Sequence, residues 1–118
     1  MTLATLALTL ATVLAIAGGQ MLFKLGALAS NTAGADVSLL VRYANAYLIT
    51  AIVVYAVATA LWVYVLKSVP LNIAYPFMGL AFVIVPLLGA VFLGEPVAAR
   101  HLIGGAVIAA GIGIVQSA

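Results

Sequence analysis

Residues 43–66, YANAYLITAIVVYAVATALWVYVL, decide the fold because they form a long apolar stretch without a charged side chain. An α-helix of about 20 apolar residues crosses the ~30 Å hydrocarbon layer of a membrane. Residues 1–23, 68–94 and 101–118 also contain no Asp, Glu, Lys or Arg. The sequence therefore predicts an all-α membrane protein with four transmembrane helices.

The composition of the chain excludes a soluble fold. Of its 118 residues, 68% are hydrophobic and 5% are charged, whereas soluble domains carry about 25% charged residues. No polar segment is long enough to form a second domain, so we expect a single domain over residues 1–118. Its four helices are predicted at residues 2–29, 45–66, 70–93 and 101–116.

The charged residues separate the apolar blocks and would mark the two membrane surfaces. They are Lys24, Asp36, Arg42, Lys67, Glu95 and Arg100. Three of the four basic residues fall on one side of the predicted membrane and Lys67 falls on the other. The positive-inside rule then favours both termini outside the cytoplasm, but the charge difference is small and both orientations stay open. The chain carries no basic patch, which argues against a nucleic-acid partner.

The first predicted helix carries polar side chains along one face. At 100° per residue, these residues share a broad stripe: Thr2, Thr5, Thr9, Thr12, Gln20 and Lys24. A polar stripe on a membrane helix faces protein or a wet cavity. Alternatively, the threonine hydroxyls bond to the backbone carbonyl four residues earlier. Gln20 is not explained in that way and needs a partner from elsewhere in the protein.

Aromatic side chains gather on one face of the second predicted helix, where Tyr55, Thr59 and Trp62 are spaced four and three residues apart. Trp and Tyr favour the headgroup zone of a membrane, which fits the position of Trp62 near the helix end. Tyr55 lies in mid-span, and for this residue interfacial anchoring and a place in a cavity wall both remain open.

The third and fourth predicted helices contain breakers and small residues. Pro76 and Pro86 each remove one helix hydrogen bond, so we expect a bent third helix. In the fourth helix, Gly105, Ala109 and Gly113 recur every four residues. A stripe of small residues lets another helix approach closely, and we expect this one to lie between the subunits of a dimer.

The residues give no support for an enzyme. Asp36 and Glu95 fall in predicted loops, and His101 has no second imidazole near it in the sequence. No nucleophile–base set, phosphate-cradling loop or metal-ligand spacing occurs. We therefore expect no catalytic residue, no metal site and no cofactor.

Lys24 is the residue whose chemistry most clearly indicates a binding role. If the first helix continues to residue 29, Lys24 lies about 7–8 Å inside its end, at 1.5 Å per residue. One interpretation is a lysine that snorkels to the interface. The other is a cation that binds an anionic headgroup such as a phosphate, with the uncharged helix walls accommodating a lipid tail.

Three stretches of the sequence resemble small four-helix transporters of the drug/metabolite superfamily. They are residues 15–24 (AIAGGQMLFK), 61–76 (LWVYVLKSVPLNIAYP) and 94–101 (GEPVAARH). All three are similar to the E-type subunit of the aminoarabinose–undecaprenyl-phosphate flippase. The resemblance spans most of the chain and implies a small-multidrug-resistance-like fold.

The resemblance also implies a function, a location and a partner. The protein would move a polyprenyl-phosphate-linked sugar between the leaflets of a bacterial inner membrane, as a multi-pass homodimer or as a heterodimer with a related four-helix subunit. Lys24 and Gln20 would contact the phosphate of this membrane lipid. The path would be lined by Tyr55, Trp62 and Tyr75. The headgroup would be handled near one surface by Glu95, Arg100 and His101.

Two other functions remain open. Related multidrug exporters carry a glutamate two turns before their lysine, where this chain has Ile16. A small-multidrug-type exporter of organic cations or guanidinium compounds would therefore lack its coupling acid here. A non-transporting subunit that scaffolds a glycolipid enzyme would need packing stripes but no polar stripe.

Overall fold

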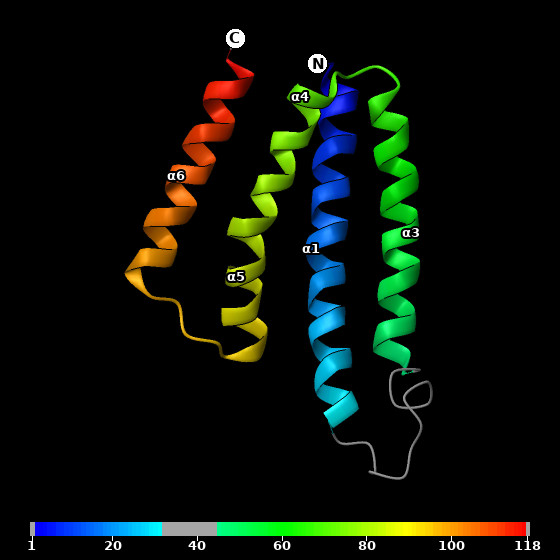
Figure 1. The fold of residues 1–118 in the computed structure, drawn as a ribbon, viewed down its shortest axis with the longest axis vertical. Coiled ribbons are helices and arrows are strands. Elements are labelled where there is room, and N and C mark those ends of the chain that lie inside the picture. Colours follow the sequence, from blue (N-terminus) through cyan, green and yellow to red (C-terminus); the bar gives the residue numbers. More distant parts are fainter. Residues whose placement is uncertain (1, 32–44, 118) are drawn as a thin grey trace.

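A computed structural model describes residues 2–31 and 45–117, and every regular element in these residues is helical (Figure 1). The elements are α1 (Leu3–Asn31), α3 (Ala46–Leu66), α4 (Leu71–Ala74), the 3₁₀ helix η1 (Tyr75–Leu80), α5 (Ala81–Leu93) and α6 (Ala99–Gln116). The predictions for Asp36 and Arg42 lie outside the described residues.

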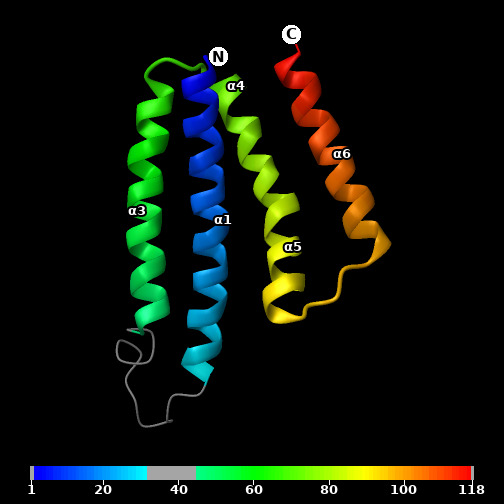
Figure 2. The same cartoon turned by 180° about the vertical axis from the view of Figure 1, so that it is seen from behind.

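Four segments are long and apolar enough to cross a membrane: α1, α3, the run Leu71–Leu93 and α6. This confirms the predicted all-α fold with four spans. Figures 1 and 2 show the helices side by side in the order α3, α1, α5 and α6. The packing contacts agree, because α1 meets both α3 and α5, whereas α6 packs on α5 and η1.

The α1–α3 pair is held by small residues that allow close approach. Ala17, Ala51 and Ala58 are at most 1% exposed. At Gly26, an added Cβ would lie 2.6 Å from a methyl carbon of Leu48, so only glycine fits there. Close packing of this kind replaces the hydrophobic effect as the main attraction between helices in lipid.

The threonines of α1 belong to this packing and not to a wet stripe. Thr9 and Thr12 are fully buried. Their Oγ1 atoms donate to the backbone carbonyls of Thr5 and Leu8, four residues earlier, at 2.7 and 2.8 Å. For these residues the local interpretation is right, because a hydroxyl bonded within its own helix can be buried without a partner from another helix.

The third span is interrupted where Pro76 lies near the start of η1. In a 3₁₀ turn the carbonyl of Ile73 would pair with the N–H of residue 76, which proline lacks. Gln116 Nε2, from the end of α6, donates to this carbonyl at 2.7 Å. The break in the third span therefore also anchors the last helix.

The small residues predicted as a packing stripe on α6 divide between two environments. At Gly105, a Cβ would lie 3.6 Å from Val83 of α5, so this position packs inside the chain. At Gly113, a Cβ would meet nothing within 4 Å. The expectation that Gly105 faces another subunit is wrong, because α5 already covers it.

A left-handed glycine ends α5. Gly94 has φ +67°, a conformation that costs other residues about 1–2 kcal/mol. It lets the N–H of Glu95 turn back to the carbonyl of Gly89 at 3.2 Å. This turn sends the chain away from α5 and sets where the α5–α6 connection begins.

Candidate functional site

The predicted site residues fall into two groups. Gln20, Tyr55, Trp62 and Tyr75 line cavities among α1, α3, η1 and α5. Glu95, Arg100 and His101 lie at the α5–α6 connection and the first turn of α6. Lys24 lines no described cavity, although it is one helical turn from Gln20.

Gln20 has the partner that its place on a membrane helix required. Its Nε2 donates a hydrogen bond to the hydroxyl of Tyr55 on α3. The Tyr55 ring lies directly against Gly19, where a Cβ would be 2.7 Å from Cδ2, and its centroid is 5.1 Å from that of Phe23. The absence of a side chain at Gly19 thus lets the tyrosine lie flat enough on α1 to reach Gln20.

Trp62 and Tyr75 form a second aromatic pair. Their ring centroids are 6.5 Å apart with an interplanar angle of 64°, an edge-to-face arrangement. Trp62 comes from α3 and Tyr75 from the first position of η1. The pair therefore joins the α1–α3 half of the protein to the third span.

Two neighbouring cavities connect these residues. The first, which we call the α1–η1 groove, has a volume of about 640 Å³ and is walled by Gln20, Tyr75 and apolar side chains. The second, the α3 recess, is about 80 Å³ and includes Tyr55, Thr59 and Trp62. The apolar walls of the groove are Ile16, Met78, Ala81, Phe82, Val85 and Pro86.

Ile16 and Met78 line both cavities, so the groove and the recess are adjacent. Neither was predicted as a site residue. The position of Ile16 could have been found, because it lies one helical turn before Gln20 on the same face. Met78 could not, since its place depends on how η1 sits against α1.

Lys24 is exposed and makes no hydrogen bond or ion pair with a described residue. It lies about 10 Å inside the end of α1 at Asn31, at 1.5 Å rise per residue. On the helix wheel it continues the line of Ile16 and Gln20, which both face the groove. Lys24 therefore follows the groove along α1, and its ammonium has no counter-ion among the described residues.

The second group surrounds the α5–α6 connection, and all three side chains are exposed. Glu95 and Arg100 form no ion pair, although they flank the same loop. The carboxylate of Glu95 lies over Gly89, close to the position that a Cβ would take there. The end of α5 thus presents an acid without a charged partner among the described residues.

His101 has a structural task. Its Nδ1 accepts the backbone N–H of Ala98 at 2.9 Å, and this closes the first turn of α6. An acceptor at Nδ1 leaves the proton of a neutral imidazole on Nε2. His101 also borders an apolar groove of about 170 Å³ between α5 and α6.

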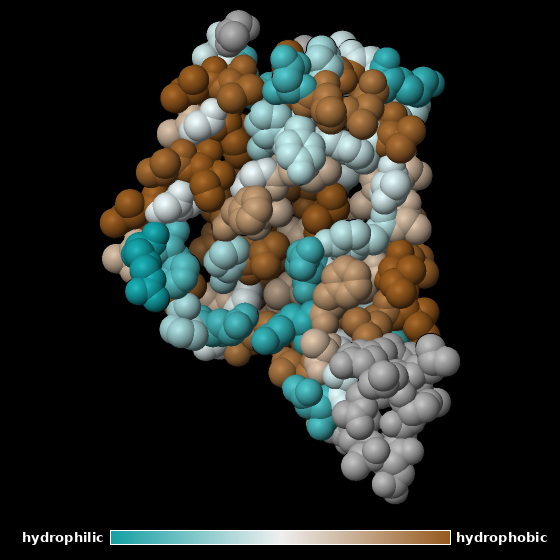
Figure 3. Space-filling view, viewed as in Figure 1, coloured by the Kyte–Doolittle hydropathy of each residue, from teal (hydrophilic) through white to brown (hydrophobic). Residues whose placement is uncertain are grey.

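The end of α1 that carries Lys24 lies towards the same end of the molecule as the second group. The C-terminal end of α1 and the α5–α6 connection both lie at the lower end in Figure 1. Figure 3 shows hydrophilic side chains at the foot of α6 and across the lower parts of α5 and α1, with hydrophobic side chains on the outer flanks. Within the described residues, no three His, Cys, Asp or Glu side chains cluster as metal ligands would.

Comparison with known proteins confirms the resemblance to the E-type flippase subunit. Over 66 residues the chain is 36% identical to a protein of Enterobacter sp. (strain 638), which covers 56% of this chain and 62% of the relative. Over 52 residues it is 50% identical to a protein of Klebsiella pneumoniae (strain 342), a match that covers 44% of this chain and 46% of the relative. Over 60 residues it is 47% identical to a protein of Escherichia coli O139:H28, a match that covers 51% of this chain and 54% of the relative.

All three relatives bear the name "Probable 4-amino-4-deoxy-L-arabinose-phosphoundecaprenol flippase subunit ArnE". The chain thus matches about half to three fifths of the length of these curated relatives. No family model matches the sequence, and no solved structure matches it either. The relatives are named as subunits of a transporter and not as enzymes, and they support a flippase role for a multi-pass membrane protein.

Proposed function

We propose that this chain is a subunit of a flippase that moves a polyprenyl-phosphate-linked amino sugar between the leaflets of a bacterial inner membrane. The observation that carries the proposal is the α1–η1 groove, a largely apolar cavity of about 640 Å³ whose polar wall residue Gln20 is followed one turn later by Lys24, which pairs with no described residue. A phosphate attached to a long hydrocarbon needs both of these features.

Lys24 would bind the phosphate, and the groove would hold the first isoprene units. The Lys24 side chain is exposed, forms no ion pair with a described residue and is long enough to move with its ligand. Gln20 is fixed by its bond to Tyr55, and its amide oxygen has no partner among the described residues. That oxygen can accept a hydrogen bond from a sugar hydroxyl or amine.

At the membrane surface, the sugar would be bound by Glu95, Arg100 and His101. An amino sugar carries a positive charge that an exposed carboxylate such as Glu95 attracts, and Arg100 offers a second contact for phosphate. His101 contributes an Nε2–H donor because Nδ1 is occupied by the backbone of Ala98. The substrate class named for the relatives carries both a positive amine and a negative phosphate. An acidic side chain and basic side chains at one end of the molecule are suited to bind these two groups.

The proposed partner is a second four-helix subunit, and the name of the relatives as flippase subunits supports the presence of a partner. Among the spans, α6 is the least covered, with 6% of its most hydrophobic 18-residue window buried inside the chain. The groove is lined by residues of α1, η1 and α5. A second subunit that covers these elements would close the path around the lipid.

The test is substitution of Lys24 in purified protein reconstituted into vesicles, alone and with its partner subunit. A fluorescent polyprenyl-phosphate amino sugar is placed in one leaflet, and its arrival in the other is followed by quencher accessibility. A hydrogen bond to a charged group is worth about 1.5–3 kcal/mol, so Lys24→Gln should slow translocation at least about tenfold. Lys24→Arg should retain most of the rate.

Translocation by Lys24→Gln at the rate of the unaltered protein would refute the phosphate role. The same vesicles distinguish a flippase from the two alternative functions, a cation exporter and a scaffolding subunit. An exporter of organic cations would bind a hydrophobic cation in a pH-dependent way, but the described spans contain no carboxylate to couple it. Translocation by the chain alone would exclude a purely scaffolding subunit.

A further inference from the structure

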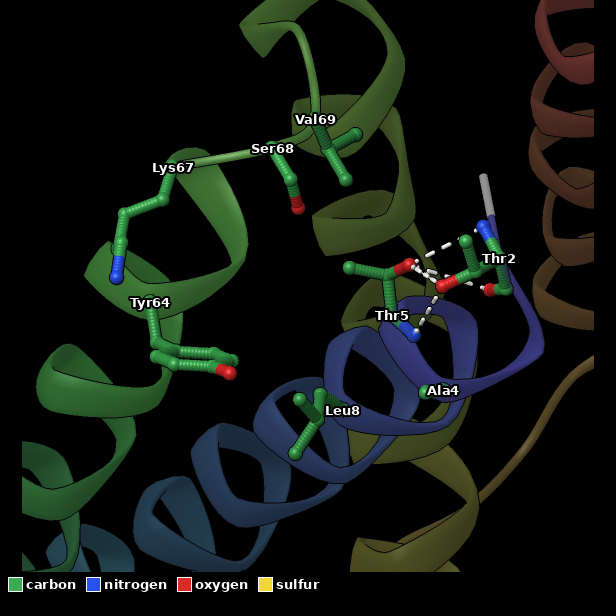
Figure 4. Close-up of a pocket in the computed structure, with 8 residues that line it drawn as sticks. All are labelled: Thr2, Ala4, Thr5, Leu8, Tyr64, Lys67, Ser68 and Val69. Carbon is green, nitrogen blue, oxygen red and sulfur yellow. Dashed lines mark hydrogen bonds between the residues drawn. The ribbon is translucent and has the colours of Figure 1, made fainter.

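A cavity of about 690 Å³ lies at the end of the molecule where α1 begins and α3 ends, and none of its lining residues is assigned above to the transport path. Figure 4 shows it between the first turn of α1 and the turn that joins α3 to α4. Since α1 begins here and α3 ends here, the cavity lies where the spans reach the membrane surface. Its volume is within the range of about 300–1,000 Å³ that small-molecule sites occupy.

Three polar groups of this cavity have no hydrogen-bond partner among the described residues: Lys67 Nζ, Ser68 Oγ and the Tyr64 hydroxyl. Figure 4 shows the Ser68 hydroxyl and the Tyr64 phenol directed into the space between the two turns. The Lys67 ammonium lies 5.2 Å from the centroid of the Tyr64 ring, a cation–π contact that keeps it at the rim. All three groups are donors that remain available to a ligand.

The opposite wall is the first turn of α1. Thr2 and Thr5 exchange hydrogen bonds, with each backbone N–H donating to the other hydroxyl at 3.1 Å. These bonds close the start of α1 and leave the threonine hydroxyls engaged with each other. The first N–H groups of a helix have no acceptor within it and carry the positive end of its dipole, and Ala4 of this turn lines the cavity.

The sign of the charge selects the ligand. No acidic side chain lines the cavity, and the one acid among the described residues, Glu95, lies at the far end of the molecule. A cation or a neutral hydrocarbon would therefore leave Lys67 unpaired. The apolar side chains of Leu8 and Val69 complete the lining and suit the uncharged part of a lipid next to its headgroup.

We propose that this cavity binds a phosphate group carried by a membrane lipid. Lys67 supplies the counter-charge, and Ser68 and Tyr64 donate hydrogen bonds to the phosphate oxygens. The proposal does not depend on transport through the Lys24 half. It gives the protein an anion site at each membrane surface, and the two sites share no residue.

The experiment is an amide NMR titration of the full ¹⁵N-labelled chain in uncharged micelles. The probes are dihexanoyl phosphatidate, inorganic phosphate and dihexanoyl glycerol, which lacks the phosphate. Phosphatidate should cause saturable shifts of the Ala4 and Ser68 amides. Lys67→Gln should raise the half-saturating concentration at least about tenfold, and Ser68→Ala should raise it less.

Lys24→Gln is the matched control, because it removes the same charge at the other end and should leave these shifts unchanged. Shifts that do not saturate, or an unchanged half-saturating concentration in Lys67→Gln with an otherwise unaltered spectrum, would overturn the proposal. Equal shifts from dihexanoyl glycerol would show that the phosphate group is not recognised. Equal affinity for inorganic phosphate would show that the lipid part of the ligand does not contribute to binding. Failure of the Lys24 translocation test would leave this titration unaffected, so the two proposals fail separately.

Discussion

The α1–α3 pair and α6 contain similar small residues but use them differently. In their most hydrophobic 18-residue windows, 28% of α1 and 6% of α6 are buried inside the chain. Between α1 and α3, each close approach is matched by a specific neighbour, as Gly19 is by the ring of Tyr55. On α6, Gly104 and Gly111 face open space. Small residues therefore permit close packing in a membrane, while a complementary side chain decides where it happens.

The difference also separates the parts of the proposed site. Gln20 and Tyr55 are fixed because the α1–α3 interface is complete within the chain. The second group depends on α6, which packs on α5 at Gly105 and on Phe77 of η1 through Ile112. Three substitutions test this contrast between a completed and an incomplete interface.

The largest effect is expected for Phe77→Ala. Phe77 is 8% exposed and packs in one cluster with Val13 of α1 and Ile112 of α6, so it joins the two halves. Phe→Ala changes in protein cores cost about 3–5 kcal/mol. We expect the lower end of this range, because lipid tails are as apolar as the core and mainly packing is lost. Denaturant unfolding in mixed micelles measures the change.

Phe82→Ala is the matched control, since the same atoms are removed from a side chain of α5 that is 72% exposed. It should change the free energy of unfolding by much less than Phe77→Ala. If both substitutions cost the same, the cluster around Phe77 does not hold the halves together, and the contrast between them fails.

Gly19→Ala should have an intermediate effect. The new Cβ would lie 2.7 Å from Cδ2 of Tyr55, so the ring must move away from α1 and its bond to Gln20 must stretch. Overpacking of this kind costs about 1–3 kcal/mol. The same unfolding experiment measures the cost, and the altered environment of Tyr55 should be visible in its ring resonances.

Gly113→Ala provides the comparison on α6, where the added methyl meets nothing within 4 Å. Alanine is the better helix former, so no loss of stability is expected for the chain alone. Equal destabilisation by the two substitutions would mean that something outside the chain packs on α6 as closely as Tyr55 packs on Gly19. That result would make the two interfaces alike.

The four spans were predictable because long apolar stretches without a charged side chain lie between the charged residues, although Lys24 falls inside α1. Spacing also placed Tyr55 and Trp62 on one face, as the α3 recess requires. It could not show that Thr9 and Thr12 bond within their own helix, since a buried and a wet threonine stripe have the same period. The one-dimensional pattern identifies a face but not the neighbour that covers it.

The site was harder to predict than the spans for the same reason. The need of Gln20 for a partner followed from its residue type, but the partner depended on the glycine at position 19. His101 was chosen for its chemistry, and its role as the cap of α6 follows from a turn that no pattern in the sequence specifies. Met78 reaches both cavities only because η1 rotates it towards α1.

The smallest effect is expected for Gln116→Ala, which removes the donor to the carbonyl of Ile73. Interhelical hydrogen bonds in membranes are worth about 0.6 kcal/mol on average, and this carbonyl loses a donor that Pro76 cannot replace. Ser117→Ala is the control, because its hydroxyl bonds within α6 to the carbonyl of Ile114. Hydrogen exchange should then rise along α6 in Gln116→Ala and stay unchanged in α1 and α3. Equal exchange in α6, α1 and α3 would instead show that α6 is anchored as firmly as the completed pair, by the packing of its Ile112 against Phe77 and Val13.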